Sequence, residues 1–177
     1  MIFSETRLQG TFLIQLEKME DERGFFARTF CEREFETHRL NSRFVQCGIS
    51  YNPRKGTLRG MHYQAPPYEE AKLVRCTSGA IYDVVLDLRL KSATHRQWIA
   101  VELTQENHKA LYIPEGCAHG FQTLRDETEV SYQMSRPHHA EAARGVRYDD
   151  SHFSIYWPQT ENRILSDNDR SYEDYLL

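Results

Sequence analysis

Cysteine is scarce in this sequence, and the cysteines that it has stand far apart. The 177 residues contain 4 cysteines, at positions 31, 47, 76 and 117, and no two of them form a Cys-x-x-Cys pair. In a chain of this length without an export signal, such spacing indicates reduced thiols rather than a disulfide framework. We therefore expect ordinary free thiols at all of these positions.

Long apolar runs and a surplus of positive charge are also missing. No uninterrupted apolar stretch approaches the ~20 residues that a bilayer-spanning helix needs, so we expect no membrane association. The start of the chain lacks a basic segment followed by an apolar stretch, which argues against a signal peptide and for a cytoplasmic protein. The formal charge of -4 and the pI near 6.1 argue against a nucleic-acid partner.

Short runs of β-forming residues separated by turns dominate what is present, above all between residues 71 and 134. Strands are expected at residues 10–18, 25–30, 55–64, 72–76, 80–88, 98–103, 110–113, 119–124 and 128–134. This spacing predicts an all-β sandwich or barrel such as a jelly roll. A helix is predicted within residues 31–40, a turn at 51–54 and one helical turn near the end. With 40% hydrophobic residues and no repeat or linker, residues 1–177 suit a single domain.

The stretch at residues 55–64 (KGTLRGMHYQ) reads as a strand but carries too many polar groups for a core. Arg59 and His62 would be costly to bury without partners. Gly60 interrupts the side-chain row at a point where a backbone often bulges or approaches another segment closely. We therefore predict that this strand lines a cavity for an anionic or carbonyl-rich ligand.

Two segments resemble the paired motifs of the cupin superfamily, a group of jelly-roll proteins. The first ends in His62-x-Gln64, and the second is Pro114-x-Gly116-x-x-His119. In metal-binding cupins the first motif carries two histidines, and here Gln64 takes the place of the second. An amide oxygen is a poor ligand for a divalent transition metal. We therefore expect no metal and no other cofactor, and acid–base chemistry instead.

Longer strings make the resemblance specific. Those that carry it lie at residues 21–26 (DERGFF), 55–64, 72–76 (KLVRC), 83–89 (DVVLDLR), 112–121 (YIPEGCAHGF) and 166–169 (SDND). Together they resemble the dTDP-4-dehydrorhamnose 3,5-epimerase family over nearly the whole chain. The resemblance implies a jelly-roll cupin with one or two short helices, usually a homodimer. It also implies epimerisation of a nucleotide-linked 4-keto-6-deoxyhexose at C3, C5 or both.

The same resemblance assigns four catalytic residues. A proton next to a ketone leaves when a base is placed over it and positive charge stabilises the enolate. His62 matches the base, and Asp169 matches the carboxylate that pairs with it. Lys72, with Arg59 as a helper, would stabilise the enolate oxygen. Tyr132 matches the acid that returns a proton from the opposite face.

The residues implied in substrate binding are Arg23, Gln46, Arg59, Lys72 and His119. Arg23 and Arg59 match positions that hold the diphosphate, where a forked guanidinium suits paired oxygens. In dimers of the family the N-terminal strand often crosses to the partner, which would bring Arg23 to the neighbouring subunit's site. Independently of the family, mid-strand Asp83 is a candidate brace for Lys72 or His62.

Each role has a plainer alternative. Taken singly, His62 and Tyr132 fit core packing, Asp169 fits a solvated tail, and Arg23 fits a surface pair with Asp21. Asp83 is equally compatible with a structural hydrogen-bond acceptor. The large aromatic residues expected in the core or a subunit interface are Phe25, Phe26, Phe30, Trp98 and Trp157. The histidines expected at the surface are His38, His95, His108, His138, His139 and His152.

Four positions depart from the family pattern, namely Arg28, Gly48, Ala143 and Asn168. The family analogy implies that all four positions help to bind the nucleotide sugar and that none of them transfers protons. This pattern suggests related chemistry on a different or loosely specified nucleotide sugar. Three alternatives stay open, which are a sugar-nucleotide 3,4-ketoisomerase, a non-catalytic carbohydrate-binding cupin and, last, a metal-dependent cupin oxygenase.

Overall fold

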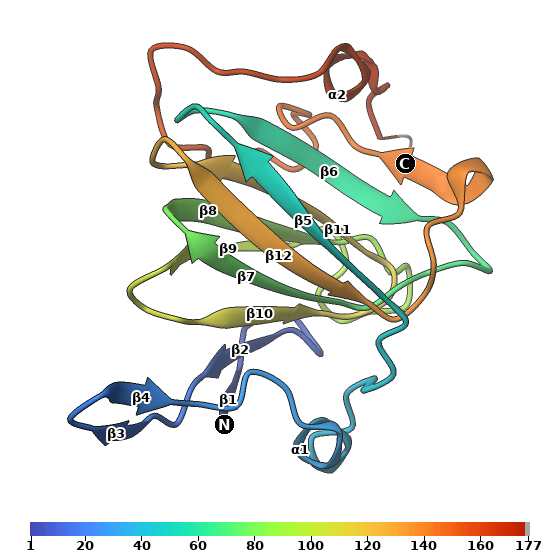
Figure 1. Ribbon diagram of the computed structural model, residues 1–177. Coiled ribbons are helices and arrows are strands. Elements are labelled where there is room, and N and C mark those ends of the chain that lie inside the picture. Colours follow the sequence, from blue (N-terminus) through green and yellow to red (C-terminus); the bar gives the residue numbers. More distant parts are fainter. Residues whose placement is uncertain (176–177) are drawn as a thin grey trace.

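Two antiparallel β-sheets packed against each other form the body of the protein in the computed structural model, which describes residues 1–175 (Figure 1). The larger sheet has the spatial order β1 (Ile2–Glu5), β2 (Phe12–Gln15), β10 (Ala110–Ile113), β7 (Lys72–Ser78), β12 (Thr128–Met134) and β5 (Gln46–Asn52). The smaller sheet has the order β13 (Ala143–Gly145), β6 (Leu58–Gln64), β11 (Cys117–Thr123), β8 (Ala80–Asp87) and β9 (Trp98–Thr104).

The remaining elements lie outside these two sheets. They are the hairpin of β3 (Met19–Asp21) and β4 (Gly24–Phe26), helices α1 (Glu32–Thr37) and α2 (Asp167–Ser171), and a 3-10 turn at Ala140–Ala142. The expected all-β sandwich with short helices is therefore confirmed. Within residues 1–175, none of the helices has the length and apolar character needed to cross a membrane.

The core between the sheets follows from the alternation of side chains along each strand. Inward residues of both sheets, such as Val74, Val85, Phe121 and Val130, form one buried apolar cluster. A second apolar cluster, which includes Trp157, packs the C-terminal tail against the outer face of the smaller sheet. A third cluster packs α1 on the outer face of the larger sheet. These layers leave one end of the sandwich interior for polar side chains.

Most expected strands are present, and the differences have local causes. The unexpected strands are β1, β3, β5 and β13, which become strands by pairing with β2, β4, β12 and β6. The turn expected at residues 51–54 begins later, since Asn52 still pairs with Thr128 of β12. The expected helix at residues 31–40 is confined to α1.

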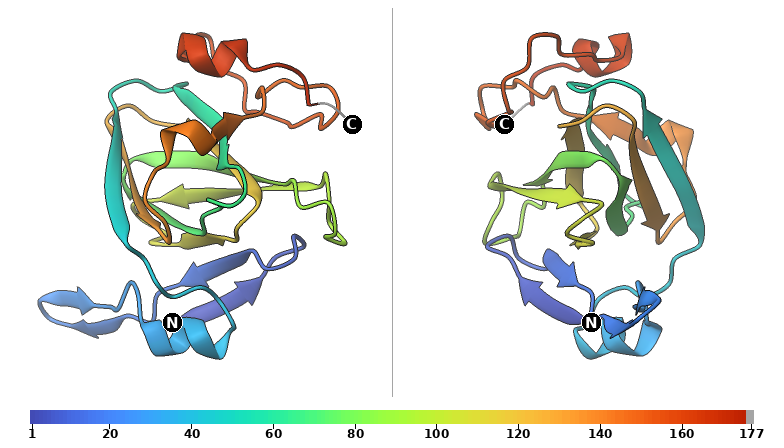
Figure 2. Two further views of the ribbon diagram at one scale, coloured as in Figure 1. Left: turned by 90° about the vertical axis from the view of Figure 1, so that its right-hand side faces the viewer. Right: turned by 60° about the vertical axis from the view of Figure 1, so that its left-hand side comes forward.

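The β3–β4 hairpin extends beyond the sandwich (Figure 2). Phe25 and Phe26 on it are 44% and 65% exposed, so their placement in the core of this chain is wrong. Within residues 1–175, β3 and β4 pair only with each other, and of the two rings Phe25 contacts His108. A subunit interface stays a prediction for both. Trp157 is buried, while Trp98 and Phe30 are half-buried against apolar neighbours, as expected.

Candidate active site

A cavity of about 530 Å³ opens between the two sheets at one end of the sandwich. Five of the residues to which the sequence gave a catalytic or substrate-binding role line it, namely Arg59, His62, Lys72, His119 and Tyr132. On the larger sheet, Lys72 and Tyr132 follow the same inward rows as the core residues Val74 and Val130. The cavity is thus the point where the inward rows change from apolar to polar.

A bulge in β6 explains how Arg59 and His62 both face the cavity. Residues three apart on a regular strand point to opposite faces. Here the register against β11 shifts, because Arg59 and His62 pair with Phe121 and His119, which are only two apart. Gly60 in the bulge has a φ of +135°, and a Cβ there would lie 2.5 Å from the Cα of Gly120. The expectation of a bulge and close approach at Gly60 is confirmed.

His62 is paired with a carboxylate that comes from the C-terminal tail. Its Nε2 lies 2.6 Å from Oδ1 of Asp169, which α2 presents, and Asp169 is 4% exposed. The Ser166 side chain caps α2 by accepting from the Asp169 N–H at 3.1 Å. Burial alone would raise the pKa of Asp169, but the His62 hydrogen bond and the Gly60 N–H outweigh it and lower that pKa. Asp169 is therefore not the solvated tail residue of the plainer alternative.

Lys72, the first residue of β7, brings a cation to the same end of the cavity. Its side chain is 11% exposed, and its Nζ lies 3.1 Å from Oε1 of Glu70. The ammonium also donates to the backbone carbonyl of His62 at 3.4 Å. Glu70 received no role from the sequence, although its spacing of two from Lys72 on an extended chain was the signal for it.

A second histidine–carboxylate pair lies deeper in the wall. His119 Nε2 is 2.7 Å from Asp83 Oδ1, and the side chains are 4% and 0% exposed. The assignment of Asp83 as a brace for Lys72 or His62 is therefore wrong. Its strand β8 neighbours β11, which carries His119, whereas β6 lies one strand further away.

Tyr132 packs its ring against His119, with ring centroids 5.9 Å apart and planes at 73°. Burial raises the pKa of the Tyr132 phenol, and nearby Asp83 acts in the same direction. The phenol consequently keeps its proton at neutral pH. This is the protonation state that a proton donor requires.

Two glutamine side chains form hydrogen bonds with the backbone of loops beside the cavity. Gln46, expected to contact the ligand, is not among the lining residues, and its side-chain oxygen accepts from the His138 N–H at 2.8 Å. Buried Gln64 donates to the Tyr68 carbonyl at 2.9 Å and accepts from the His139 N–H at 2.5 Å. In this way both amides hold the segment that contains His138 and His139.

The expectation that all other histidines lie at the surface is wrong in part. His138 is exposed as expected and also lines the cavity, whereas His139 is half-buried with its ring stacked 3.8 Å from that of Tyr68. His95 and His108 are also half-buried, while His38 and His152 are exposed. No periodic pattern distinguished these positions, because loop packing placed them.

Arg23 lies far from this cavity within the chain. It is on the β3–β4 hairpin, at the end of the molecule opposite α2 (Figure 1). Its side chain is 85% exposed and binds Asp21 at 2.5 Å, which matches the plainer alternative. A role at the site of a neighbouring subunit stays a prediction.

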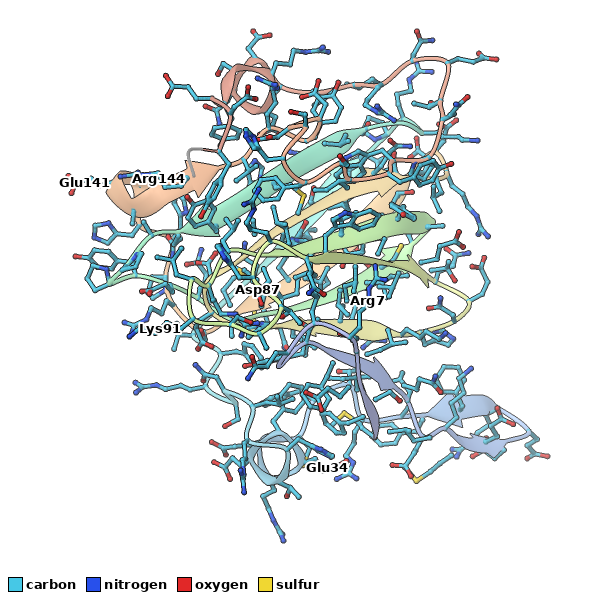
Figure 3. All side chains as sticks on the ribbon, turned by 180° about the vertical axis from the view of Figure 1, so that it is seen from behind. Arg7, Glu34, Asp87, Lys91, Glu141 and Arg144 are labelled. Atoms are coloured by element: carbon cyan, nitrogen blue, oxygen red, sulfur yellow. The ribbon has the colours of Figure 1, made fainter. Side chains whose placement is uncertain are left out.

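The four departures from the family pattern divide into two groups. Ala143 and Asn168 line the cavity, whereas Arg28 pairs with Glu34 at 2.7 Å and Gly48 lies on the edge strand β5. Arg144, next to Ala143 on β13, lines the cavity as well (Figure 3). The altered positions that reach the site are therefore those of β13 and α2.

Tyr172, at the end of α2, is a lining residue that the sequence did not indicate. Its hydroxyl accepts from the Asn168 side-chain amide at 2.8 Å, and its ring centroid lies 6.1 Å from that of His62. The ring approaches the backbone of Gly145 so closely that a Cβ there would lie 2.1 Å from it. A polar tail without periodicity contains no signal for such a contact.

Metal ligation was expected to be absent because Gln64 replaces a histidine. Within residues 1–175, no three His, Cys, Asp or Glu side chains are grouped to hold a metal ion. His62 and His119 are each bound through Nε2 to a carboxylate instead. That the protein works without a cofactor stays a prediction.

Comparison with known proteins agrees with this geometry. The family model described as dTDP-4-dehydrorhamnose 3,5-epimerase matches residues 5–175. A dTDP-4-dehydrorhamnose 3,5-epimerase from Sinorhizobium fredii is 40% identical over 171 residues, which cover 97% of this chain and 88% of the relative.

Solved structures show the same likeness. The dTDP-4-dehydrorhamnose 3,5-epimerase from Bacillus anthracis, with TDP and PPi bound, is 38% identical, with a TM-score of 0.94 and coverage of 98% of this chain and 99% of that chain. The dTDP-6-deoxy-D-glucose-3,5-epimerase from Legionella pneumophila, in complex with dTDP-4-keto-L-rhamnose, is 36% identical, with a TM-score of 0.89 and coverage of 95% and 89%. The cupin-type β-sandwich is confirmed, and the chain belongs to the dTDP-4-dehydrorhamnose 3,5-epimerase family.

Proposed function

We propose that this protein epimerises a dTDP-linked 4-keto-6-deoxyhexose at C3, C5 or both, through an enolate. The observation that carries the proposal is the convergence of the His62–Asp169 pair, Lys72 and Tyr132 on one cavity. The relatives support the substrate class, since a family structure contains dTDP-4-keto-L-rhamnose. Because Ala143 and Asn168 line the cavity, the particular sugar remains the open part of the proposal.

His62 is proposed as the base that removes the proton next to the ketone. Its Nε2 is occupied by Asp169, which leaves Nδ1 as the nitrogen available to a ligand. When Nδ1 takes the proton, the ring becomes an imidazolium whose charge the Asp169 carboxylate stabilises. The buried Asp169 also fixes the orientation of the ring.

Inversion requires that a second group return a proton from the other side. His62 projects from the smaller sheet and Tyr132 from the larger sheet, so a sugar between the sheets meets them on opposite faces. Lys72 lies beside His62, and we propose that its ammonium, which Glu70 holds at 3.1 Å, donates a hydrogen bond to the enolate oxygen. Arg59 and His119 are proposed to bind the nucleotide sugar from the same cavity.

Solvent exchange tests the reaction directly. The protein is incubated with dTDP-4-keto-6-deoxyglucose and related keto sugars in deuterated water, and C3 and C5 are followed by NMR. We expect deuterium at one or both carbons together with inversion. Movement of the ketone without inversion at C5 would indicate a ketoisomerase, and binding without any exchange would indicate a non-catalytic protein.

Replacement of Tyr132 with phenylalanine separates the two proton transfers. The variant keeps the ring that packs on His119 but loses the phenolic proton. We expect inversion to slow about 10²-fold, within the range for general acid catalysis, while deuterium uptake at the first carbon slows much less. Equal loss of both signals would contradict the role of Tyr132 as the acid.

The assembly and location of the protein belong to the same proposal. We infer a cytoplasmic homodimer of single-domain subunits that acts without a cofactor. Exposed apolar side chains on the projecting hairpin, Met19, Phe25 and Phe26, support an interface there. In such a dimer Arg23 would reach the partner's diphosphate site. Sedimentation of the wild type and of Phe26→Ser tests this, and a wild type that sediments as a monomer would contradict it.

A further inference from the structure

A buried asparagine at the end of β5 contacts the cavity arginine but not the cavity itself. Asn52 is 0% exposed, and its side-chain amide is fully enclosed by protein. Its Oδ1 accepts from Nε of Arg59 at 2.8 Å. Buried amides need partners for all their polar atoms, so these contacts fix how Asn52 is oriented.

The orientation of the Asn52 amide follows from its other neighbours. Its Nδ2 donates to the backbone carbonyls of Ser50 at 3.0 Å and Thr128 at 3.2 Å, with the Ser50 hydroxyl at 3.4 Å. Carbonyl oxygens accept only, so the NH₂ group must face them and the amide oxygen must face Arg59. The reversed amide would set oxygen against oxygen and N–H against N–H.

This contact uses one donor of Arg59, and its other donors have no hydrogen-bond partner among residues 1–175. A guanidinium has N–H groups on Nε and on both terminal nitrogens, and Asn52 binds only Nε. The forked end that suits paired phosphate oxygens therefore remains available on the side that lines the cavity. Holding Nε also restricts the rotamers of Arg59 before a ligand arrives, so less side-chain freedom is lost on binding.

The chemistry of the partner matters as much as its position. Within residues 1–175, no carboxylate lies within ion-pair distance of Arg59, whereas Arg89 is held by Asp87 at 2.7 Å. A carboxylate partner would neutralise the guanidinium before a ligand arrives. Asn52 is neutral, so it orients Arg59 and leaves its full charge for an anion.

We propose that Asn52 is a positioning residue that holds Arg59 ready for the diphosphate of a nucleotide sugar. The proposal rests on the proposed function for the class of ligand, a nucleoside diphosphate. Asn52 itself does not touch the ligand, and its contribution passes through Arg59. Loss of Asn52 consequently matters only when Arg59 is present.

Binding of TDP, measured by calorimetry, tests this coupling without any turnover. We expect Asn52→Ala to weaken TDP binding about tenfold, since Arg59 then has to be ordered on binding. In the Arg59→Ala background the same substitution is expected to change the affinity less than twofold. Equal weakening in both backgrounds, or no weakening by Asn52→Ala alone, would overturn the proposal.

A matched control separates positioning from loss of stability. Asn107 lies in the turn between β9 and β10, accepts from the Thr104 and Lys109 N–H groups and donates to the Glu102 carbonyl. Asn107→Ala removes a comparable set of amide hydrogen bonds away from the cavity. We expect it to lower the melting temperature while leaving the Kd for TDP unchanged. A similar loss of TDP affinity in Asn107→Ala would show that the Asn52 effect is general destabilisation.

Kinetics distinguish failure of this proposal from failure of the proposed function. For Asn52→Ala we expect a KM raised about tenfold and a kcat within twofold of the wild type. The reason is that the substitution weakens binding of the substrate and of the transition state equally. An active wild type with an unaltered variant overturns only the role of Asn52. A wild type that binds TDP with the expected coupling but exchanges no proton overturns only the epimerase. Failure of the wild type to bind TDP overturns both.

Discussion

The cavity contains two histidine–carboxylate pairs whose environments differ. His62 and His119 are direct partners on the neighbouring strands β6 and β11, and each is bound through Nε2. The His62 side chain is 42% exposed and its carboxylate comes from the tail. His119 and Asp83 are almost completely buried, and both belong to the sheet.

This difference indicates separate roles for the two pairs. A base must reach the ligand and change its charge, which requires exposure to the cavity and a carboxylate that accommodates an imidazolium. The His62–Asp169 pair meets both conditions. The His119–Asp83 pair is almost completely buried, so His119 is suited to contact the nucleotide sugar and to support the ring of Tyr132 rather than to act as the base.

Removing the exposed histidine should give the largest effect. We expect His62→Ala to lower deuterium uptake into the keto sugar roughly 10³-fold, the middle of the range for a general base. NMR in deuterated water measures the rate. His152→Ala is the control, because His152 also pairs with an aspartate, Asp150 at 2.8 Å, but does not line the cavity. Uptake by His62→Ala within tenfold of the wild type would remove His62 from the role of base.

Removing the charge of its partner should have the next largest effect. Asp169→Asn keeps the shape but no longer stabilises the imidazolium, so we expect uptake to fall about 10²-fold. Asp83→Asn is expected to lower the rate less than this, because its histidine does not carry the proton. A larger loss of rate in Asp83→Asn than in Asp169→Asn would reverse the assignment of the two pairs.

We expect the free energy of unfolding to depend more on Asp83 than on Asp169, which is the reverse of their order in activity. Asp83→Asn alters a fully buried pair, and we expect a loss of about 1–3 kcal/mol in the free energy of unfolding in urea.

The contribution of Asp169 to the free energy of unfolding should depend on pH. Its folded pKa is lowered, so its stabilisation is present above the unfolded pKa near 3.8 and disappears as the pH falls through the folded pKa. A gap between wild type and Asp169→Asn that does not narrow as the pH falls below 3.8 would contradict this linkage.

The smallest expected effect comes from the contact between the Tyr172 ring and Gly145 beside His62. Gly145→Ala places a methyl group where the Tyr172 ring lies, so the ring must move away from His62. We expect uptake to slow about fivefold, a cost near 1 kcal/mol. Tyr172→Phe keeps the ring, loses only the Asn168 bond and should stay within twofold. Identical rates for Gly145→Ala and the wild type would show that the position of the Tyr172 ring does not influence the base.

Much of the site was predictable because its residues lie on strands with a regular period. The inward rows that end in Lys72 and Tyr132 follow from alternation, and the polar strand at residues 55–64 indicated a cavity before any fold was known. Asp83 was placed correctly in the middle of a strand but was given the wrong partner. Choosing between β6 and β11 as its neighbour requires the strand order, which alternation does not contain.

The sequence by itself determined most of the β-strands, the candidate catalytic set and the family, because these depend on local pattern and on matching strings. Only the tertiary structure decided that Arg59 and His62 share a face, since the bulge at Gly60 exists through its contact with Gly120. The pairing of His62 with Asp169, 107 positions away, was implied by the family resemblance and is confirmed, but only the tertiary structure decided that α2 buries Asp169 against the Gly60 N–H. Such contacts depend on how a tail packs on a finished sheet, and no local periodicity encodes that packing.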